Sequence, residues 1–89
     1  MEELKEEIQS LNMEELEEKM FRERKQMVEF AEENGQWQLF DDQQSIGSMR
    51  KAIEQMPESE IKTEIRRRFN RVELMYDKYT TMIVEDTVQ

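Results

Sequence analysis

The sequence contains neither cysteine nor histidine. The lack of cysteine excludes disulfide bonds and thiolate metal sites. The lack of histidine excludes Ser-His and Cys-His nucleophile pairs, and any zinc or di-iron site that needs an imidazole ligand. Ser48 and Lys51 have the spacing of a Ser-x-x-Lys pair, but the companion motifs of that enzyme class are missing, so we interpret both as helix-surface residues. We therefore expect a protein that is not an enzyme and that uses no cofactor or metal.

Glycine and long apolar runs are also scarce. The two glycines, Gly35 and Gly47, stand apart, so the chain has no glycine-rich phosphate-binding loop. The longest fully apolar run, Met82-Ile83-Val84, is far too short for a transmembrane span. Met1 is followed by two glutamates rather than by the basic and apolar stretch of a secretory signal. These features favour a cytoplasmic protein without a membrane segment.

Apolar residues make up 36% of the chain, which is below the roughly 45–50% of typical globular domains. Eight methionines compensate for part of this deficit, and we expect a small core. The formal net charge is −9. A strongly acidic chain repels nucleic acids and anionic membranes at long range. Direct nucleic-acid binding is therefore disfavoured, and a basic protein partner is favoured.

Apolar residues recur at helical spacing through most of the sequence, which predicts an all-α fold. We expect one domain, residues 1–84, followed by a C-terminal tail at residues 85–89. The domain should be a bundle of four helices of unequal length, at about residues 2–11, 13–33, 43–56 and 58–83. Residues 36–45 alternate like a short strand at Trp37 and Leu39, but no partner strand is evident, so we expect an ordered loop.

Short polar residues, glycine and proline mark the expected helix ends. Asn12, with Glu15 three residues further on, has the form of a capping box for the second helix. The β-branched run at residues 80–84 is expected to fray or end the fourth helix, because such side chains lose freedom in a helix. The remaining signals are Asn34-Gly35 as the stop of the second helix, Asp41 or Asp42 as the cap of the third, and Pro57 in the first turn of the fourth.

Two apolar stripes define the surfaces that need to be covered. Met13, Met20 and Met27 recur every seven residues, and we interpret them as a soft core rather than as a clasp for a partner helix. The fourth helix would be about 39 Å long, which exceeds the roughly 30 Å diameter of a compact domain of this size. We therefore expect a homodimer, or a larger homo-oligomer, that covers a stripe with coiled-coil spacing at Phe69, Val72, Tyr76 and Tyr79.

The excess of acid lies mainly in the first two expected helices. Carboxylates one helical turn apart are separated by about 6 Å in rise, comparable with phosphates along a nucleic-acid strand, so this surface could occupy the groove of a basic, nucleic-acid-binding protein. The residues expected to contact the partner are Glu14, Glu15, Glu17, Glu18, Glu32, Glu33 and Trp37. Two alternatives remain open: a nucleic-acid-associated protein that contacts phosphates through the basic band at residues 62–71, and a purely structural oligomerisation module.

Overall fold

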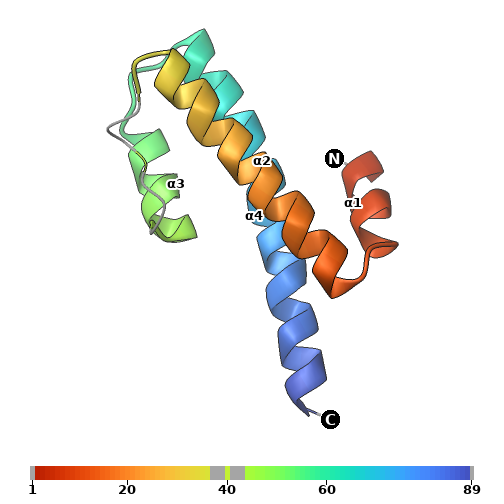
Figure 1. Ribbon diagram of the computed structural model, residues 1–89. Coiled ribbons are helices and arrows are strands. Elements are labelled where there is room, and N and C mark those ends of the chain that lie inside the picture. Colours follow the sequence, from red (N-terminus) through yellow and green to blue (C-terminus); the bar gives the residue numbers. More distant parts are fainter. Residues whose placement is uncertain (1, 37–39, 41–43, 89) are drawn as a thin grey trace.

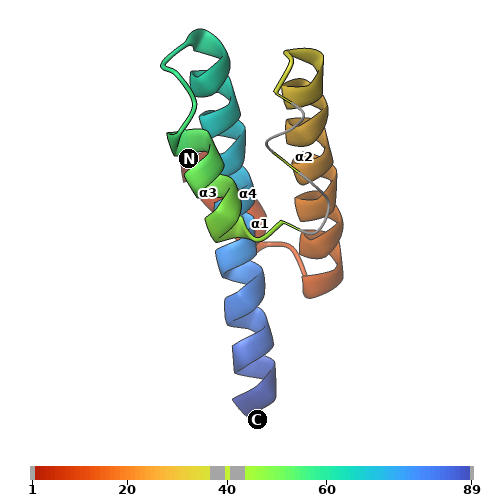
Figure 2. The same ribbon diagram turned by 90° about the vertical axis from the view of Figure 1, so that its left-hand side faces the viewer.

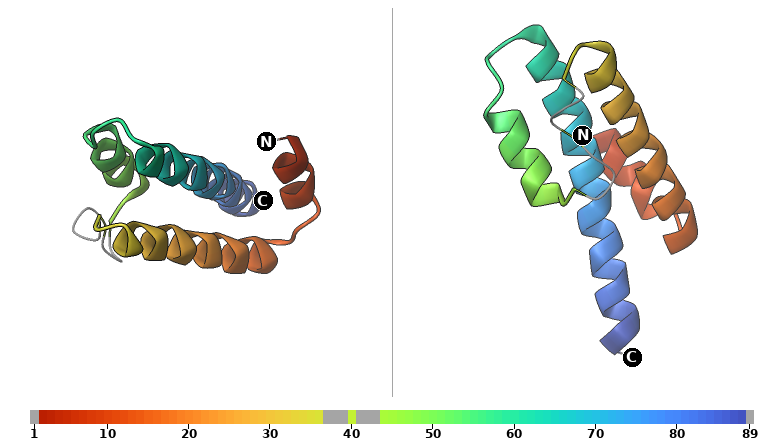
Figure 3. Two further views of the ribbon diagram at one scale, coloured as in Figure 1. Left: turned by 90° about the horizontal axis from the view of Figure 1, so that it is seen from above. Right: turned by 60° about the vertical axis from the view of Figure 1, so that its left-hand side comes forward.

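The computed structural model describes residues 2–36, 40 and 44–88, and over these residues the fold is all-α. α2 and α4 are long helices that run antiparallel to each other (Figure 1). α3 packs against the N-terminal half of α4, and α1 packs against its middle (Figure 3). The four helices are α1 (Glu2–Gln9), α2 (Met13–Glu33), α3 (Ile46–Glu54) and α4 (Glu60–Val88). The predicted all-α bundle of four helices is confirmed.

The start of α2 is fixed by the predicted capping box. The side-chain Oδ1 of Asn12 accepts a hydrogen bond from the backbone N–H of Glu15 at 2.8 Å, and Glu15 Oε1 accepts one from the backbone N–H of Asn12 at 3.0 Å. α1 ends at Gln9, earlier than expected, because Ser10 and Leu11 make tighter bonds to carbonyls three residues back. The capping box thus separates the first two helices as predicted.

The end of α2 is fixed by glycine. Gly35 has φ +77°, a left-handed conformation that carries no Cβ penalty in glycine. Its N–H bonds to the carbonyl of Glu32, and the N–H of Gln36 bonds to that of Ala31 at 2.7 Å. These two bonds form a Schellman motif and satisfy carbonyls that the helix end would otherwise leave free. The predicted stop at Asn34-Gly35 is confirmed.

α3 and α4 begin later than the sequence pattern indicated. Ser45 caps α3 by accepting from the N–H of Ser48 at 3.1 Å, so the helix starts at Ile46 rather than at residue 43. Ser59, not Pro57, precedes α4, and its hydroxyl accepts from the N–H of Lys62 at 3.1 Å. Two further expectations concern the segment between α2 and α3: Asp41 or Asp42 as the cap of α3, and an ordered loop or short strand around Trp37 and Leu39. These four residues lie outside the described residues.

The expectation that residues 80–84 end the fourth helix is wrong, because α4 continues to Val88. Each β-branched residue in the run destabilises a helix by well under 1 kcal/mol relative to alanine. Residues 85–88 contain no glycine or proline that would stop the helix. The hydroxyls of Thr80 and Thr81 also donate to the carbonyls of Tyr76 and Asp77, both at 2.9 Å. As a result α4 projects beyond the other helices (Figure 2), and the molecule measures 44 × 26 × 18 Å.

The core consists of two apolar clusters along the contact between α2 and α4. The first joins the C-terminal half of α2 to α3 and the start of α4, around Met27, Met49, Ile65 and Phe69. The second joins α1 and the start of α2 to the middle of α4. Its buried members are Leu4, Ile8, Leu16, Met20, Val72 and Met75. Met20 and Met27 are buried and Met13 is half-buried, in accord with a soft core.

A buried lysine of α4, Lys62, forms hydrogen bonds to the segment that connects α3 to α4. Lys62 is only 4% exposed. Its ammonium donates to the carbonyl oxygens of Met56 at 2.8 Å and Glu54 at 3.3 Å, and it pairs with Glu58 at 2.7 Å. These carbonyls belong to the last turn of α3 and the residues after it, where intrahelical donors run out. The lysine therefore caps one helix from the first turn of the next.

Candidate interaction surfaces

The carboxylates expected to bind a partner fall into two groups. Glu14, Glu18, Glu32 and Glu33 are exposed on α2. Glu15 is exposed as well, but its carboxylate belongs to the capping box that starts α2. Trp37, the remaining expected contact, lies outside the described residues.

Glu17 also differs from the exposed group. It is only partly exposed, and its Oε2 accepts a hydrogen bond from the Tyr79 hydroxyl of α4 at 2.9 Å. The pKa of Tyr79 is raised, mainly by this hydrogen bond and further by desolvation and by the negative charge of Glu17. Glu15 therefore has the intramolecular role that the capping-box pattern predicted, whereas the bond between Glu17 and Tyr79 had no signal in the sequence.

Helical geometry places the exposed acids on one face. At 100° per residue, Glu14, Glu18 and Glu32 lie within about 40° of one another around α2, opposite the buried Met20 and Met27. Glu29 is also exposed and lies about 20° beyond Glu18, so the four residues span about 60°, although Glu29 was not among the residues expected from the sequence. Its spacing of eleven residues from Glu18, close to three full turns, was the signal that could have identified it. We call Glu14, Glu18, Glu29 and Glu32 the acidic face of α2.

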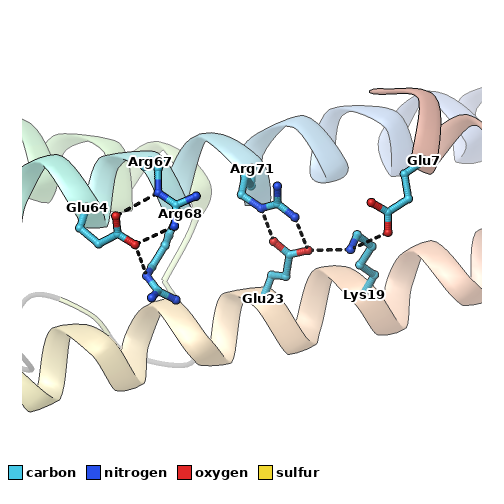
Figure 4. Close-up of polar contacts among 7 residues, drawn as sticks. All are labelled: Glu7, Lys19, Glu23, Glu64, Arg67, Arg68 and Arg71. Atoms are coloured by element: carbon cyan, nitrogen blue, oxygen red, sulfur yellow. Dashed lines mark hydrogen bonds and ion pairs between the residues drawn. The ribbon is translucent and has the colours of Figure 1, made fainter. Parts of the chain in front are cut away.

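Behind this face, a chain of charges joins three helices (Figure 4). Lys19 Nζ lies 3.0 Å from Glu7 of α1 and 2.9 Å from Glu23 of α2. Glu23 in turn accepts from Arg71 of α4 at 2.7 Å and 3.1 Å. The side chains of Lys19 and Glu23 are 13% and 14% exposed. Glu23 lies seven residues after Leu16 and seven before Phe30, in an otherwise apolar row of α2, and it faces these cations instead of the core.

The protonation equilibria of this chain favour the charged forms. Burial alone would raise the pKa of Glu23, but hydrogen bonds from Arg71 and Lys19 outweigh burial and leave that pKa below its ordinary value. The hydrogen bond to Glu23 likewise raises the pKa of Lys19 and of Arg71. The Glu23 carboxylate thus holds two cations, one from its own helix and one from α4.

A second carboxylate organises the neighbouring arginines. Glu64 accepts from Arg67 at 2.7 Å and 2.9 Å and from Arg68 at 3.0 Å (Figure 4). The hydrogen bond from Arg67 is the main reason that the pKa of Glu64 is lowered. The Arg68 guanidinium also lies 4.8 Å from the centre of the Phe30 ring of α2, a cation–π distance. Together with Lys62 and Arg71, these arginines place four of the five basic side chains at residues 62–71 in contacts within the chain, and Arg66 is exposed.

A groove of about 360 Å³ runs between α2 and α4 at this band. Its walls carry basic and amide side chains and one carboxylate, that of Glu23. The residues that line it are Lys19, Arg22, Glu23 and Gln26 of α2, and Arg67, Arg68 and Arg71 of α4.

The expected inter-chain stripe is divided by the fold. Phe69 and Val72 are buried within the single chain, covered by α2, α3 and α1, so these two positions are not available to another chain in this arrangement. Tyr76 is 43% exposed, and Ile83, which continues the stripe on the projecting end of α4, is 42% exposed. Tyr79 is half-buried against the second cluster. Oligomerisation through the outer part of α4 stays a prediction.

Comparison with known proteins gives no related family or structure from which a function could be inferred. No family model, no curated protein and no solved structure matches the chain. Within the described ranges, no three acidic side chains come together as a group able to hold a metal ion. Among the same residues, no helix combines the length and apolar character needed to cross a membrane.

Proposed function

We propose that the protein binds a basic protein partner through the acidic face of α2 and thereby regulates or inhibits it. The supporting observation is how the charges are used within the chain. Among the described residues, which include 13 basic side chains and all of the 22 acidic ones except Asp41 and Asp42, ion pairs join six bases to five acids. The bases are Lys19, Arg50, Lys62, Arg67, Arg68 and Arg71, and the acids are Glu7, Glu23, Glu58, Glu64 and Glu73.

This imbalance favours a cationic partner. Each ion pair cancels one charge of each sign, so the net charge of −9 is carried by the carboxylates that remain solvated. Exposed charges that are not paired contribute little to stability, but they accelerate encounter with an oppositely charged surface. A nucleic-acid-binding protein has such a surface, and the one-turn spacing of Glu14 and Glu18 resembles the repeat of phosphates that it recognises.

The nucleic-acid alternative has weaker support. Lys62, the first residue of the basic band, is buried and hydrogen-bonded to backbone carbonyls. Arg67, Arg68 and Arg71 are paired with carboxylates of the same chain. A long polyanion would also meet the repulsion of the net charge of −9.

The test is a comparative affinity capture at two salt concentrations. The bait variant Glu14→Gln, Glu18→Gln, Glu29→Gln, Glu32→Gln removes four charges from the acidic face, and Gln preserves helix propensity. A matched control removes four exposed charges elsewhere: Glu54→Gln, Glu60→Gln, Glu85→Gln and Asp86→Asn. We expect the wild type and the control to retain basic proteins that the acidic-face variant does not retain. These proteins should elute between 50 and 500 mM salt, since exposed charge pairs are screened over that range. Retention by all three baits, or captured proteins that resist salt, would contradict the proposal.

A further inference from the structure

The groove between α2 and α4 concentrates positive charge in an otherwise acidic molecule. Five cations line it, whereas Glu23 is the only acidic residue in its wall. Three carboxylates pair with these cations, Glu23, Glu64 and Glu7. Lys19 and Arg71 share Glu23, and Lys19 also pairs with Glu7, so these four charges cancel. Arg67 and Arg68 share Glu64, which leaves one positive charge in excess, and Arg22 in the groove wall adds a second.

The guanidinium groups also retain unused donors. An arginine has five N–H donors in a fixed fork. Arg67 and Arg71 each use two contacts on a carboxylate, and Arg68 uses one. The carboxylates therefore fix the orientation of the arginines without satisfying them, which reduces the entropy lost when a further acceptor binds.

The geometry points to a binding site in this groove for a small phosphate-bearing molecule. Arginine forks match the oxygens of phosphate, and a charge-assisted bond of this kind is about twice as strong as a neutral one. Arg67 and Arg71 stand one helical turn apart, about 6 Å in rise, so two linked phosphoryl groups can engage both arginines. The volume of about 360 Å³ is within the range of small-molecule sites.

The net charge of the protein does not oppose a ligand of this size. At physiological ionic strength the Debye length is about 8 Å, so carboxylates farther than this from the groove are largely screened from it. The five cations in the groove wall act within that distance. A small oxyanion therefore experiences the local excess of positive charge, whereas a long polyanion would extend into the acidic surroundings. This inference does not rest on the proposed partner binding by the acidic face.

Pyrophosphate is the probe, titrated into the isotopically labelled full chain at constant ionic strength and followed by NMR. We expect the arginine Nε–H signals of Arg67 and Arg71 and the backbone amides of residues 19–26 to shift with saturation. Inorganic phosphate should bind more weakly than pyrophosphate, because it engages fewer guanidinium groups. Equal affinity for the two anions would overturn the two-arginine geometry.

The variant Arg22→Gln, Arg67→Gln should weaken pyrophosphate binding by at least about tenfold, since it removes two charge-assisted contacts. Both side chains are exposed, and Glu64 keeps Arg68 as a partner, so the fold should be retained. The matched control Lys25→Gln, Arg66→Gln removes the same charge from the same two helices outside the groove and should change the affinity less than about twofold. Equal weakening in both variants, or wild-type shifts no larger than those caused by sodium chloride, would refute the site.

Discussion

Replacing Glu23 by Gln would test whether the charge chain between α1, α2 and α4 stabilises the fold. The substitution keeps the shape of the side chain but removes the charge that accepts two bonds from Arg71 and one from Lys19. A hydrogen bond to a charged group contributes about 1.5–3 kcal/mol when buried. Arg71 is about one-third exposed, so solvent screens part of this interaction, and we expect a total loss of about 2 kcal/mol.

A loss of that size is measurable in a domain this small. It corresponds to a fall in melting temperature of about 8–16 °C, and urea unfolding followed by circular dichroism should show a lower midpoint with an unchanged slope. Glu14→Gln is the control, because Glu14 is exposed on the same helix without an ion pair in the described structure, and its effect should stay within about 0.5 kcal/mol.

The same prediction has a defined pH dependence. The pKa of Glu23 in the folded protein is lowered from the ordinary value of 4.5, so the unfolded chain binds this proton more readily than the folded one. The stabilisation is therefore complete at pH values well above 4.5 and is lost as the pH falls through the folded-state pKa. The difference between wild type and Glu23→Gln should shrink in acid. Equal stability of the two proteins at pH 7, or a difference that is constant down to pH 2, would refute the reasoning.

Two further predictions concern the ends of α4. Lys62→Met keeps the apolar stem but leaves the carbonyls of Glu54 and Met56 without their donor, so unfolding should require about 1–2 kcal/mol less; a variant as stable as the wild type would mean that burying the ammonium cancels its bonds. If the projecting part of α4 pairs with a second copy, sedimentation velocity should give a dimer for the wild type and a folded monomer for Tyr76→Glu, Ile83→Glu, since both residues are exposed in the single chain. A wild type that sediments as a monomer at 100 μM would contradict this.

Local signals in the sequence predicted the parts of the fold that local interactions determine. The bounds of α2 follow from Asn12, Glu15 and Gly35, whose hydrogen bonds are all made within a few residues. The start of α3 was missed because aspartate and serine are both good N-caps, and the sequence offers both before Ile46. The end of α4 was missed because a weak propensity is not a stop signal.

The sequence could not specify what covers an apolar stripe. The spacing that places Phe69 and Val72 on one face of α4 is the same for an antiparallel helix of the same chain as for a helix of another chain. A helix of about 39 Å would not fit in a spherical domain of this size, but the molecule is elongated, at 44 × 26 × 18 Å, and its own helices cover most of α4. For the same reason the ion pair between Glu23 and Arg71, 48 residues apart, had no signature in the sequence.

The methionines of the two clusters make the interior of this protein sensitive to oxidation. Five of them are buried: Met20, Met27, Met49, Met56 and Met75. Oxidation turns a flexible apolar thioether into a polar sulfoxide, which has no hydrogen-bond partner in either cluster. Because an oxidant reaches a buried sulfur only when the helices separate, the rate of sulfoxide formation at Met27 and Met75 would report how often the first and the second cluster open. A core with leucine at the same positions would pack similarly, but leucine does not form a sulfoxide and could not report the opening of the clusters.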